Sequence, residues 1–199
     1  MRRRIRTALA AAAALALAAG LSACSGEDTL ADQYREGSNK GYIAGDGTYV
    51  EIAPEDRGDP VVFDGGTVDG STYDSTAHDG EVLVVNFWYA ACAPCRAEAP
   101  ILADLDERLG DGASIVGINI RDAAGQANAF DEQFGIGYPS ILDVDSGMAQ
   151  LAFAGDVPPN AVPTTIVLDR EHRVAARLLG QISDASIIDS MVDTVLEED

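Results

Sequence analysis

The chain has 199 residues, 47% of them hydrophobic, so it is long enough to bury the core of one domain with additional segments. Only 13 Lys and Arg residues stand against 33 Asp and Glu residues, which gives a formal net charge of -20. Such an acidic chain argues against nucleic acid or an anionic lipid surface as a binding partner, because both would repel it.

Residues 1–23 are typical of a bacterial lipoprotein signal peptide. Four arginines among the first six residues precede an apolar run over residues 7–19, which is too short to span a membrane comfortably. The run leads into Leu21-Ser22-Ala23-Cys24, which resembles a lipobox, the motif whose cysteine is diacylated and becomes the first mature residue. We therefore expect a lipid anchor on Cys24 and a position at the extracytoplasmic face of the cell membrane. An ordinary signal peptide with a cysteine nearby by chance is the alternative.

Residues 24–46 are predicted to form a flexible tether, because glycine, serine and charged residues outnumber apolar ones there. About 20 such residues have an r.m.s. reach of ~25 Å, enough to hold a domain away from the membrane without fixing its orientation. One folded domain is expected over residues 47–199.

The domain is expected to begin with two short strands, at residues 49–52 and 61–63, the second just before Gly65-Gly66. Residues 71–80 are polar and turn-rich, so we interpret them as a loop.

A central strand followed by a helix is the strongest pattern in the chain. Residues 82–87 are almost all β-branched or apolar, which is typical of a strand buried on both faces. Residues 96–109 carry apolar side chains at helical spacing. Cys92-Ala93-Pro94-Cys95 joins the two elements, with Pro94 in the first helical turn, where its missing N–H costs nothing.

The two cysteines at this junction form a candidate redox pair. If Cys24 carries lipid, Cys92 and Cys95 are the remaining two of three cysteines, and an oxidising compartment would permit a disulfide between them. At the helix N-terminus, free backbone N–H groups and the helix dipole favour a Cys92 thiolate. Exchange needs one exposed thiolate and a second thiol that resolves the mixed disulfide. We therefore predict that Cys92 is the exposed attacking thiol and Cys95 the buried resolving thiol.

The remaining elements alternate between strands and helices. We expect strands at residues 114–120 and 141–142, helices at 123–134 and 147–153, a hairpin of strands 164–168 and 174–179, and a last helix capped by Ser183 or Asp184 and running to about Leu196.

Several motifs together resemble the thioredoxin superfamily, and more closely its membrane-anchored TlpA/ResA-like thiol–disulfide oxidoreductases. They are Asn86-Phe87-Trp88, Cys92-Ala93-Pro94-Cys95, Glu98, Pro100, and a distant block over residues 162–169 closed by Gly180. The resemblance covers roughly residues 47–199. It implies an α/β thioredoxin fold, with a central mixed sheet flanked by helices, an N-terminal β extension and an αβ insertion at about residues 122–155.

The resemblance also implies roles for individual residues. Cytosolic thioredoxins carry a buried aspartate where this chain has Asn86, whose amide cannot accept a proton, and Glu98 is then the active-site acid that shuttles protons. A solvated surface glutamate is the alternative. The Val162-Pro163 peptide bond would be cis, and the Val162 backbone would pair with an extended substrate segment beside the sulfurs. Trp88 would pack beside Cys92, shield it from water and belong with Val162 and Pro163 to the substrate-binding residues; a plain core tryptophan is the alternative.

The implied function is reduction of disulfides in client proteins outside the cytoplasm. Apocytochrome c or haem-handling proteins would be clients, and a membrane thiol carrier of the DsbD/CcdA type would supply electrons. No cofactor or metal is implied, because the dithiol is itself the redox group. We expect a monomer. Reduction is favoured on physical grounds because Arg96 is the only basic residue adjoining the dithiol, which leaves the thiolate weakly stabilised.

Other functions of the same fold are less consistent with the sequence. A peroxiredoxin-like peroxidase would need Thr three residues before its cysteine, where Tyr89 stands. A copper-binding chaperone would have three residues between its cysteines and a distant histidine ligand. A zinc site would need further ligands, and His78 and His172, which we expect at the surface, lack the spacing. A structural disulfide would close too small a loop to stabilise much. An oxidative disulfide donor remains open, because Ala93-Pro94 carries no charge that tunes the pair.

Overall fold

The computed structural model describes residues 49–158 and 161–198. The predicted signal peptide, the tether and Cys24 lie outside these residues. Within the described ranges, no helix is both long enough and apolar enough to cross a membrane.

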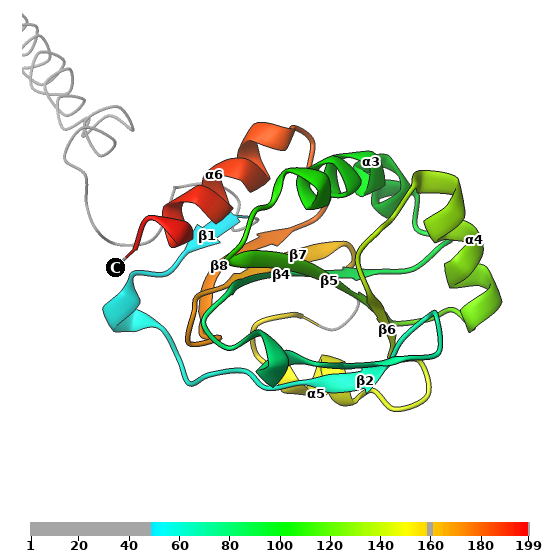
Figure 1. Ribbon diagram of the computed structural model, residues 1–199, viewed down its shortest axis with the longest axis horizontal. Coiled ribbons are helices and arrows are strands. Elements are labelled where there is room, and N and C mark those ends of the chain that lie inside the picture. The colour runs from blue at the N-terminus through cyan, green and yellow to red at the C-terminus, as the bar shows by residue number, and fades with distance from the viewer. Residues whose placement is uncertain (1–48, 159–160, 199) are drawn as a thin grey trace, which may run out of the picture. The chain divides into compact units, whose positions relative to one another are not determined.

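A six-stranded mixed sheet forms the centre of the domain (Figure 1). Its strands β4, β5 and β6 run parallel, and every other pair of neighbours is antiparallel. The order across the sheet is β1 (Tyr49–Glu51), β8 (Val174–Leu179), β7 (Thr164–Leu168), β4 (Val82–Trp88), β5 (Ala113–Asn119) and β6 (Ser140–Leu142). This arrangement confirms the predicted thioredoxin-type α/β fold.

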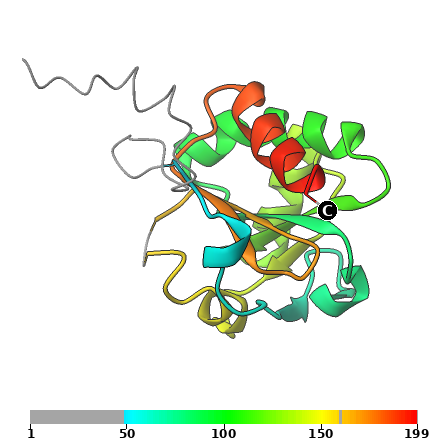
Figure 2. The same cartoon turned by 90° about the vertical axis from the view of Figure 1, so that its left-hand side faces the viewer.

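Helices cover both faces of the sheet, as Figures 1 and 2 show. One face carries α3 (Ala93–Arg108) and α6 (Ala185–Leu196), with α4 (Ala124–Phe134) beside α3. The other face carries α5 (Met148–Ala152) and the ribbon of β2 (Asp64–Gly66) and β3 (Thr72–Asp74). The short 3-10 helices are η1 (Pro54–Asp56) and η2 (Ser75–His78).

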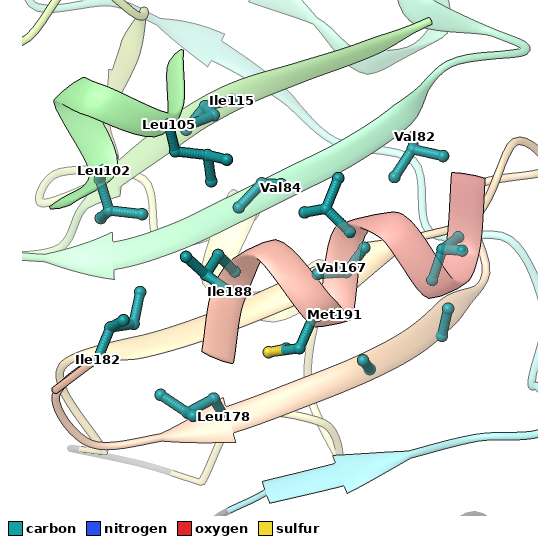
Figure 3. Close-up of a cluster of buried hydrophobic side chains, with 14 of the residues drawn as sticks. Val82, Val84, Leu102, Leu105, Ile115, Val167, Leu178, Ile182, Ile188 and Met191 are labelled. Carbon is teal, nitrogen blue, oxygen red and sulfur yellow. The ribbon is translucent and has the colours of Figure 1, made fainter. Parts of the chain in front are cut away.

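Strand β4 is buried on both faces because each face meets its own apolar cluster. Val82 and Val84 pack with side chains of α3 and α6, among them Leu102 and Ile188 (Figure 3). Leu83, Val85 and Phe87 belong to a second cluster that includes Phe153, directly after α5. Since side chains alternate along a strand, the next two positions toward α3 are Asn86 and Trp88. Near its C-terminal end, β4 therefore presents the polar side chain of Asn86 to α3.

The predicted strands and helices from residue 82 onward are confirmed, with boundaries that differ by no more than about three residues. Helix α3 begins three residues earlier than its apolar pattern suggested because Cys92 is its N-cap. Helix α6 is capped by Asp184, whose carboxylate accepts a hydrogen bond from the Ser186 N–H.

The prediction for the segment before β4 is wrong in two places. Residues 61–63 form no strand. The strand is instead Asp64–Gly66, paired with Thr72–Asp74 inside the stretch interpreted as a loop. Val61 and Phe63 are nevertheless buried in the core, while Val62 is exposed. Their apolar character therefore reflects contact with the core and does not reflect strand pairing.

The expectation that His172 lies at the surface is also wrong. His172 is only 3% exposed and adopts a positive φ of 59° in the turn between β7 and β8. The turn folds the ring back so that its Nε2 atom lies 3.2 Å from the carbonyl oxygen of His78. His78 itself is partly buried.

Candidate functional site

Cys92 and Cys95 form a disulfide where β4 passes into α3, with Cα atoms 5.2 Å apart. Cys92 is the N-cap of the helix, and its Sγ accepts a hydrogen bond from the Cys95 N–H at 3.2 Å. Pro94 lies in the first turn, as predicted. After reduction, this N–H and the helix dipole would stabilise a thiolate at Cys92.

The expectation that Cys92 is exposed is wrong for this disulfide form. Cys92 is 3% exposed and Cys95 is 2% exposed. Trp88 and the buried face of α4 pack in the same cluster, and Val162 closes it from a distant part of the chain. Exposure therefore does not distinguish the two sulfurs. Their surroundings do, because Cys92 meets the helix N-terminus and Val162, whereas Cys95 lies one helical turn before Glu98.

The distant block predicted to face the dithiol does so. The Val162–Pro163 peptide bond is cis, which confirms that prediction. The Val162 carbonyl oxygen lies 3.9 Å from the Cys92 Sγ. Gly180 holds this segment in place, because its N–H donates to the Pro163 carbonyl at 2.8 Å. The backbone of Val162 thus lies directly beside the sulfur predicted to react.

Glu98 is buried behind the dithiol, with 1% of the residue exposed, so the surface alternative for its position is excluded. Its Oε1 accepts a hydrogen bond from Asn86 Nδ2 at 3.0 Å, and its Oε2 accepts one from the Ile182 N–H at 2.8 Å. Asn86 Nδ2 also donates to Thr165 Oγ1 at 3.1 Å. The carboxyl group is therefore held by two donors that are far apart in the sequence, and Thr165 holds one of them, Asn86.

Burial raises the pKa of Glu98 to about 7, and the hydrogen bonds from the Ile182 N–H and the Asn86 amide oppose this rise only in part. Both donors are neutral, and no Lys or Arg of the described residues pairs with the carboxylate. A group whose pKa lies near neutral can both accept and release a proton at that pH. The site therefore contains a proton acceptor on the same helix as Cys95.

Sequence reasoning missed the group that holds the loop before Cys92. The Asp122 carboxylate accepts hydrogen bonds from the Ala90 N–H at 2.5 Å and from Asn119 Nδ2 at 2.9 Å. Asn119 Oδ1 in turn accepts the Asp122 N–H at 2.8 Å. Both side chains are buried. The available signal was the polar pair Asn119 and Asp122, three residues apart, at the end of a buried strand.

The structure also brings a second guanidinium group to this loop. Arg121 lies over the ring of Tyr89, 4.5 Å from its centroid. Arg96, the one basic neighbour recognised in the sequence, donates to the Ala90 carbonyl at 3.3 Å and lies 4.9 Å from the centroid of the Phe134 ring. Two positive charges therefore flank the loop that precedes the dithiol.

The two histidines are far from the dithiol. His78 precedes β4 and Cys92 follows it, so a strand of seven residues, roughly 20 Å long, separates them. His172 lies against His78. Among residues 49–158 and 161–198, no three His, Cys, Asp or Glu side chains gather as a metal site requires.

Comparison with known proteins gives three consistent results. Residues 53–196 match the Redoxin family. The chain is 32% identical over 130 residues to the thiol:disulfide interchange protein HelX of Rhodobacter capsulatus, which covers 62% of this chain and 65% of HelX. It is 30% identical over 113 residues to the thiol–disulfide oxidoreductase ResA of Bacillus subtilis, which covers 56% of this chain and 60% of ResA. The chain thus spans less than two thirds of the length of both curated relatives.

A solved structure matches over more of its length. The crystal structure of a DsbF homologue from Corynebacterium diphtheriae aligns with a TM-score of 0.68 and 35% sequence identity, over 76% of this chain and 95% of that one. The alignment supports the thioredoxin-like fold described above.

Glu98→Gln should remove a pH-dependent part of the free energy of unfolding. The folded-state pKa of about 7 lies above the ordinary value of 4.5, so between these values the folded protein keeps a proton that the unfolded chain has lost. The contribution is fully present below about pH 4.5 and disappears as the pH rises through 7, a loss of roughly 3 kcal/mol. Urea unfolding at pH 5.0 and 7.5 measures most of this loss, roughly 2 kcal/mol.

Glu132→Gln is the control, because Glu132 is an exposed helical glutamate outside the site, so the variant should lose as much stability between the two pH values as the wild type. If wild type and Glu98→Gln lose the same stability between the two pH values, Glu98 does not hold the proton described here.

Proposed function

This chain belongs to the Redoxin family, and we propose that it is a thiol–disulfide oxidoreductase that reduces client proteins outside the cytoplasm. The single observation that carries the proposal is the Cys92–Cys95 pair at a helix N-terminus, 3.9 Å from the carbonyl oxygen of Val162. This geometry places a reactive sulfur beside a backbone edge that an extended client segment can pair with.

The proposed reaction proceeds through a mixed disulfide. The Cys92 thiolate attacks one sulfur of the client disulfide, and the other client sulfur leaves as a thiolate that takes a proton from solvent. Cys95 then loses its proton, attacks the Cys92 sulfur and releases the second client sulfur as a thiolate, which also takes a proton from solvent. Two electrons pass to the client, and Cys92 and Cys95 end as the disulfide seen in the structure.

Glu98 is proposed to take the proton from Cys95. It follows Cys95 by one helical turn on the same face, and its raised pKa lets it accept a proton near neutral pH. Asn86 cannot accept that proton and instead orients the carboxyl group by donating to Oε1.

Reduction is the proposed direction because ionised Glu98 opposes thiolate formation in the dithiol. In a reductant, ionisation of the attacking thiol stabilises the reduced form only weakly. Arg96 and Arg121 favour the opposite direction, since positive charge near the loop stabilises a thiolate. These two groups make an oxidative disulfide donor the second candidate function.

The proposed partners follow from the same assignment. Apocytochrome c or haem-handling proteins would be clients. A membrane thiol carrier of the DsbD/CcdA type would reduce the Cys92–Cys95 disulfide and so regenerate the dithiol. We further propose that lipid on Cys24 anchors the protein to the outer face of the cell membrane, as a monomer on a flexible tether.

Cys95→Ala should accumulate covalent complexes with client proteins, because Cys92 can still attack but no thiol resolves the mixed disulfide. Cys92→Ala should accumulate none. Non-reducing electrophoresis followed by mass spectrometry of the linked peptides measures the complexes. Equal trapping by the two variants would contradict the assigned roles.

The Cys92–Cys95 couple should behave as a reductant when equilibrated with dithiothreitol or glutathione buffers and quantified by thiol alkylation. We expect a reduction potential well below that of known oxidants, about -120 mV. A value near that figure, together with rapid oxidation of a reduced unfolded protein, would establish the oxidative donor instead.

Cys24→Ala should abolish lipid attachment while leaving the thiol chemistry intact, because Cys24 lies outside the domain that holds the dithiol. Mass spectrometry of the purified protein and membrane fractionation report the difference. Wild-type protein without acyl mass and in the soluble extracellular fraction would refute the lipid anchor.

A further inference from the structure

We propose that Asp122 is a positioning residue of the redox pair: it fixes the turn that carries Cys92, and its buried charge makes the pair more reducing. The inference rests on the proposed function and names a residue that sets the direction of exchange. The hydrogen bonds of the Asp122 carboxylate go to Ala90 and Asn119 rather than to a sulfur, so it acts through the backbone of the turn and through its charge.

One peptide group connects Asp122 to Cys92. This group, between Tyr89 and Ala90, donates its N–H to the Asp122 carboxylate at 2.5 Å. Its carbonyl oxygen, which belongs to Tyr89, accepts the Cys92 N–H at 3.1 Å. A carboxylate that accepts an N–H polarises the peptide group, and this strengthens the hydrogen bond at the carbonyl end. The attacking cysteine is therefore held by a peptide group whose other end is bound to Asp122.

The residue at the centre of this turn has no polar side chain of its own. Ala90 carries only a methyl group, and charged side chains from elsewhere bind its two backbone polar groups. Asp122 accepts its N–H, and Arg96 Nη1 donates to its carbonyl oxygen at 3.3 Å. Asp122 thus fixes the side of the turn that follows β4, and Arg96 fixes the side that leads into α3.

Asp122 is itself held by the end of β5. Asn119 is fully buried and donates its side-chain amide to the Asp122 carboxylate at 2.9 Å. Its Oδ1 accepts the backbone N–H groups of Arg121 and Asp122, at 3.1 and 2.8 Å. Asn119 is also the register partner of Trp88, the last residue of β4, and the Ile120 N–H donates to the Trp88 carbonyl at 3.1 Å. The two strand ends therefore carry the carboxylate and the turn in one rigid frame.

Neutral donors bind the charge of Asp122. Its carboxylate accepts from one backbone N–H and one side-chain amide, and the residue is only 6% exposed. The neighbouring guanidinium groups bind elsewhere, because Arg121 lies over the Tyr89 ring and Arg96 donates to a backbone carbonyl and a glutamine. The hydrogen bonds around the turn place the carboxylate within about 10 Å of the Cys92 sulfur. At that distance a negative charge opposes ionisation of the thiol, even after screening by salt.

The redox pair consequently has two buried carboxyl groups with different tasks. Glu98 follows Cys95 on α3 and is proposed to exchange the proton, whereas Asp122 is bound to the turn ahead of Cys92 and supplies a fixed charge. A thiolate that is weakly stabilised makes the disulfide the favoured state, which is the condition for a reductant. Asp122 thereby opposes the oxidising influence of the two arginines beside the turn.

The experiment removes the charge and keeps a hydrogen-bond acceptor. In Asp122→Asn the amide oxygen is still available to the Ala90 N–H. The couple is equilibrated with glutathione buffers and quantified by thiol alkylation, and ultraviolet absorbance follows ionisation of the thiols in the reduced protein. We expect the ionisation constant of Cys92 to rise roughly fivefold. The equilibrium should shift toward the dithiol by up to that factor, which corresponds to about 20 mV.

Asp104→Asn is the matched control, because Asp104 is exposed on α3 and lies about 14 Å beyond Cys95 along the helix axis. It removes the same charge at more than a Debye length of about 10 Å and should leave the equilibrium unchanged. Asp122→Ser is a second neutral variant and should shift the equilibrium in the same direction as Asp122→Asn. Asp122→Ala, which removes every acceptor, should in addition slow the attack of the reduced protein on client disulfides.

The other outcomes overturn the inference in distinguishable ways. An equilibrium and a thiol titration that keep their wild-type values in both neutral variants would overturn it, while reduction of client disulfides by the wild type would leave the proposed function standing. Slower exchange with an unchanged equilibrium would also overturn it, because Asp122 would then only support the turn. A wild-type protein that reduces no client disulfide would overturn both.

Discussion

The burial of β4 on both faces is the constraint on which the rest of the structure depends. Its first four residues, 82–85, pack alternately against the helices on one side and the α5 cluster on the other. Because successive side chains alternate, the last residues divide between the faces, with Asn86 and Trp88 toward α3 and Phe87 toward α5. The redox chemistry thus lies on one face of a rigid strand end, and the sheet separates it from the α5 cluster.

A carboxyl group enclosed in this packing is costly when ionised. Glu98 has two neutral donors and no cationic partner among the described side chains, so its charge is only partly compensated and its pKa rises to about 7. A surface carboxylate would stay ionised at neutral pH and could rarely hold a proton. The unfavourable burial is therefore the property that makes Glu98 suitable for receiving a proton from the dithiol.

Backbone contacts between distant segments complete the site. Asp122 holds the Ala90 N–H ahead of the cysteines, Glu98 holds the Ile182 N–H before α6, and Gly180 holds the Pro163 carbonyl. Each contact joins two segments that meet at the end of the sheet where β4 ends. The sulfurs, Glu98 and the Val162 edge consequently keep one mutual arrangement, which the proposed exchange with clients would require.

The sequence by itself determined the central strand, the helix that follows it and the position of Cys92 at their junction, because hydrophobic periodicity and capping are local properties. It also placed Val162-Pro163 at the dithiol, though only through resemblance to relatives. The tertiary structure alone decided that Cys92 is buried, that residues 61–63 fill the core without pairing, and that His172 turns inward. It alone brought Arg121 and Asp122 to the redox site. Burial and proximity between residues far apart in the chain depend on how the elements pack, and no local pattern of residues encodes that packing.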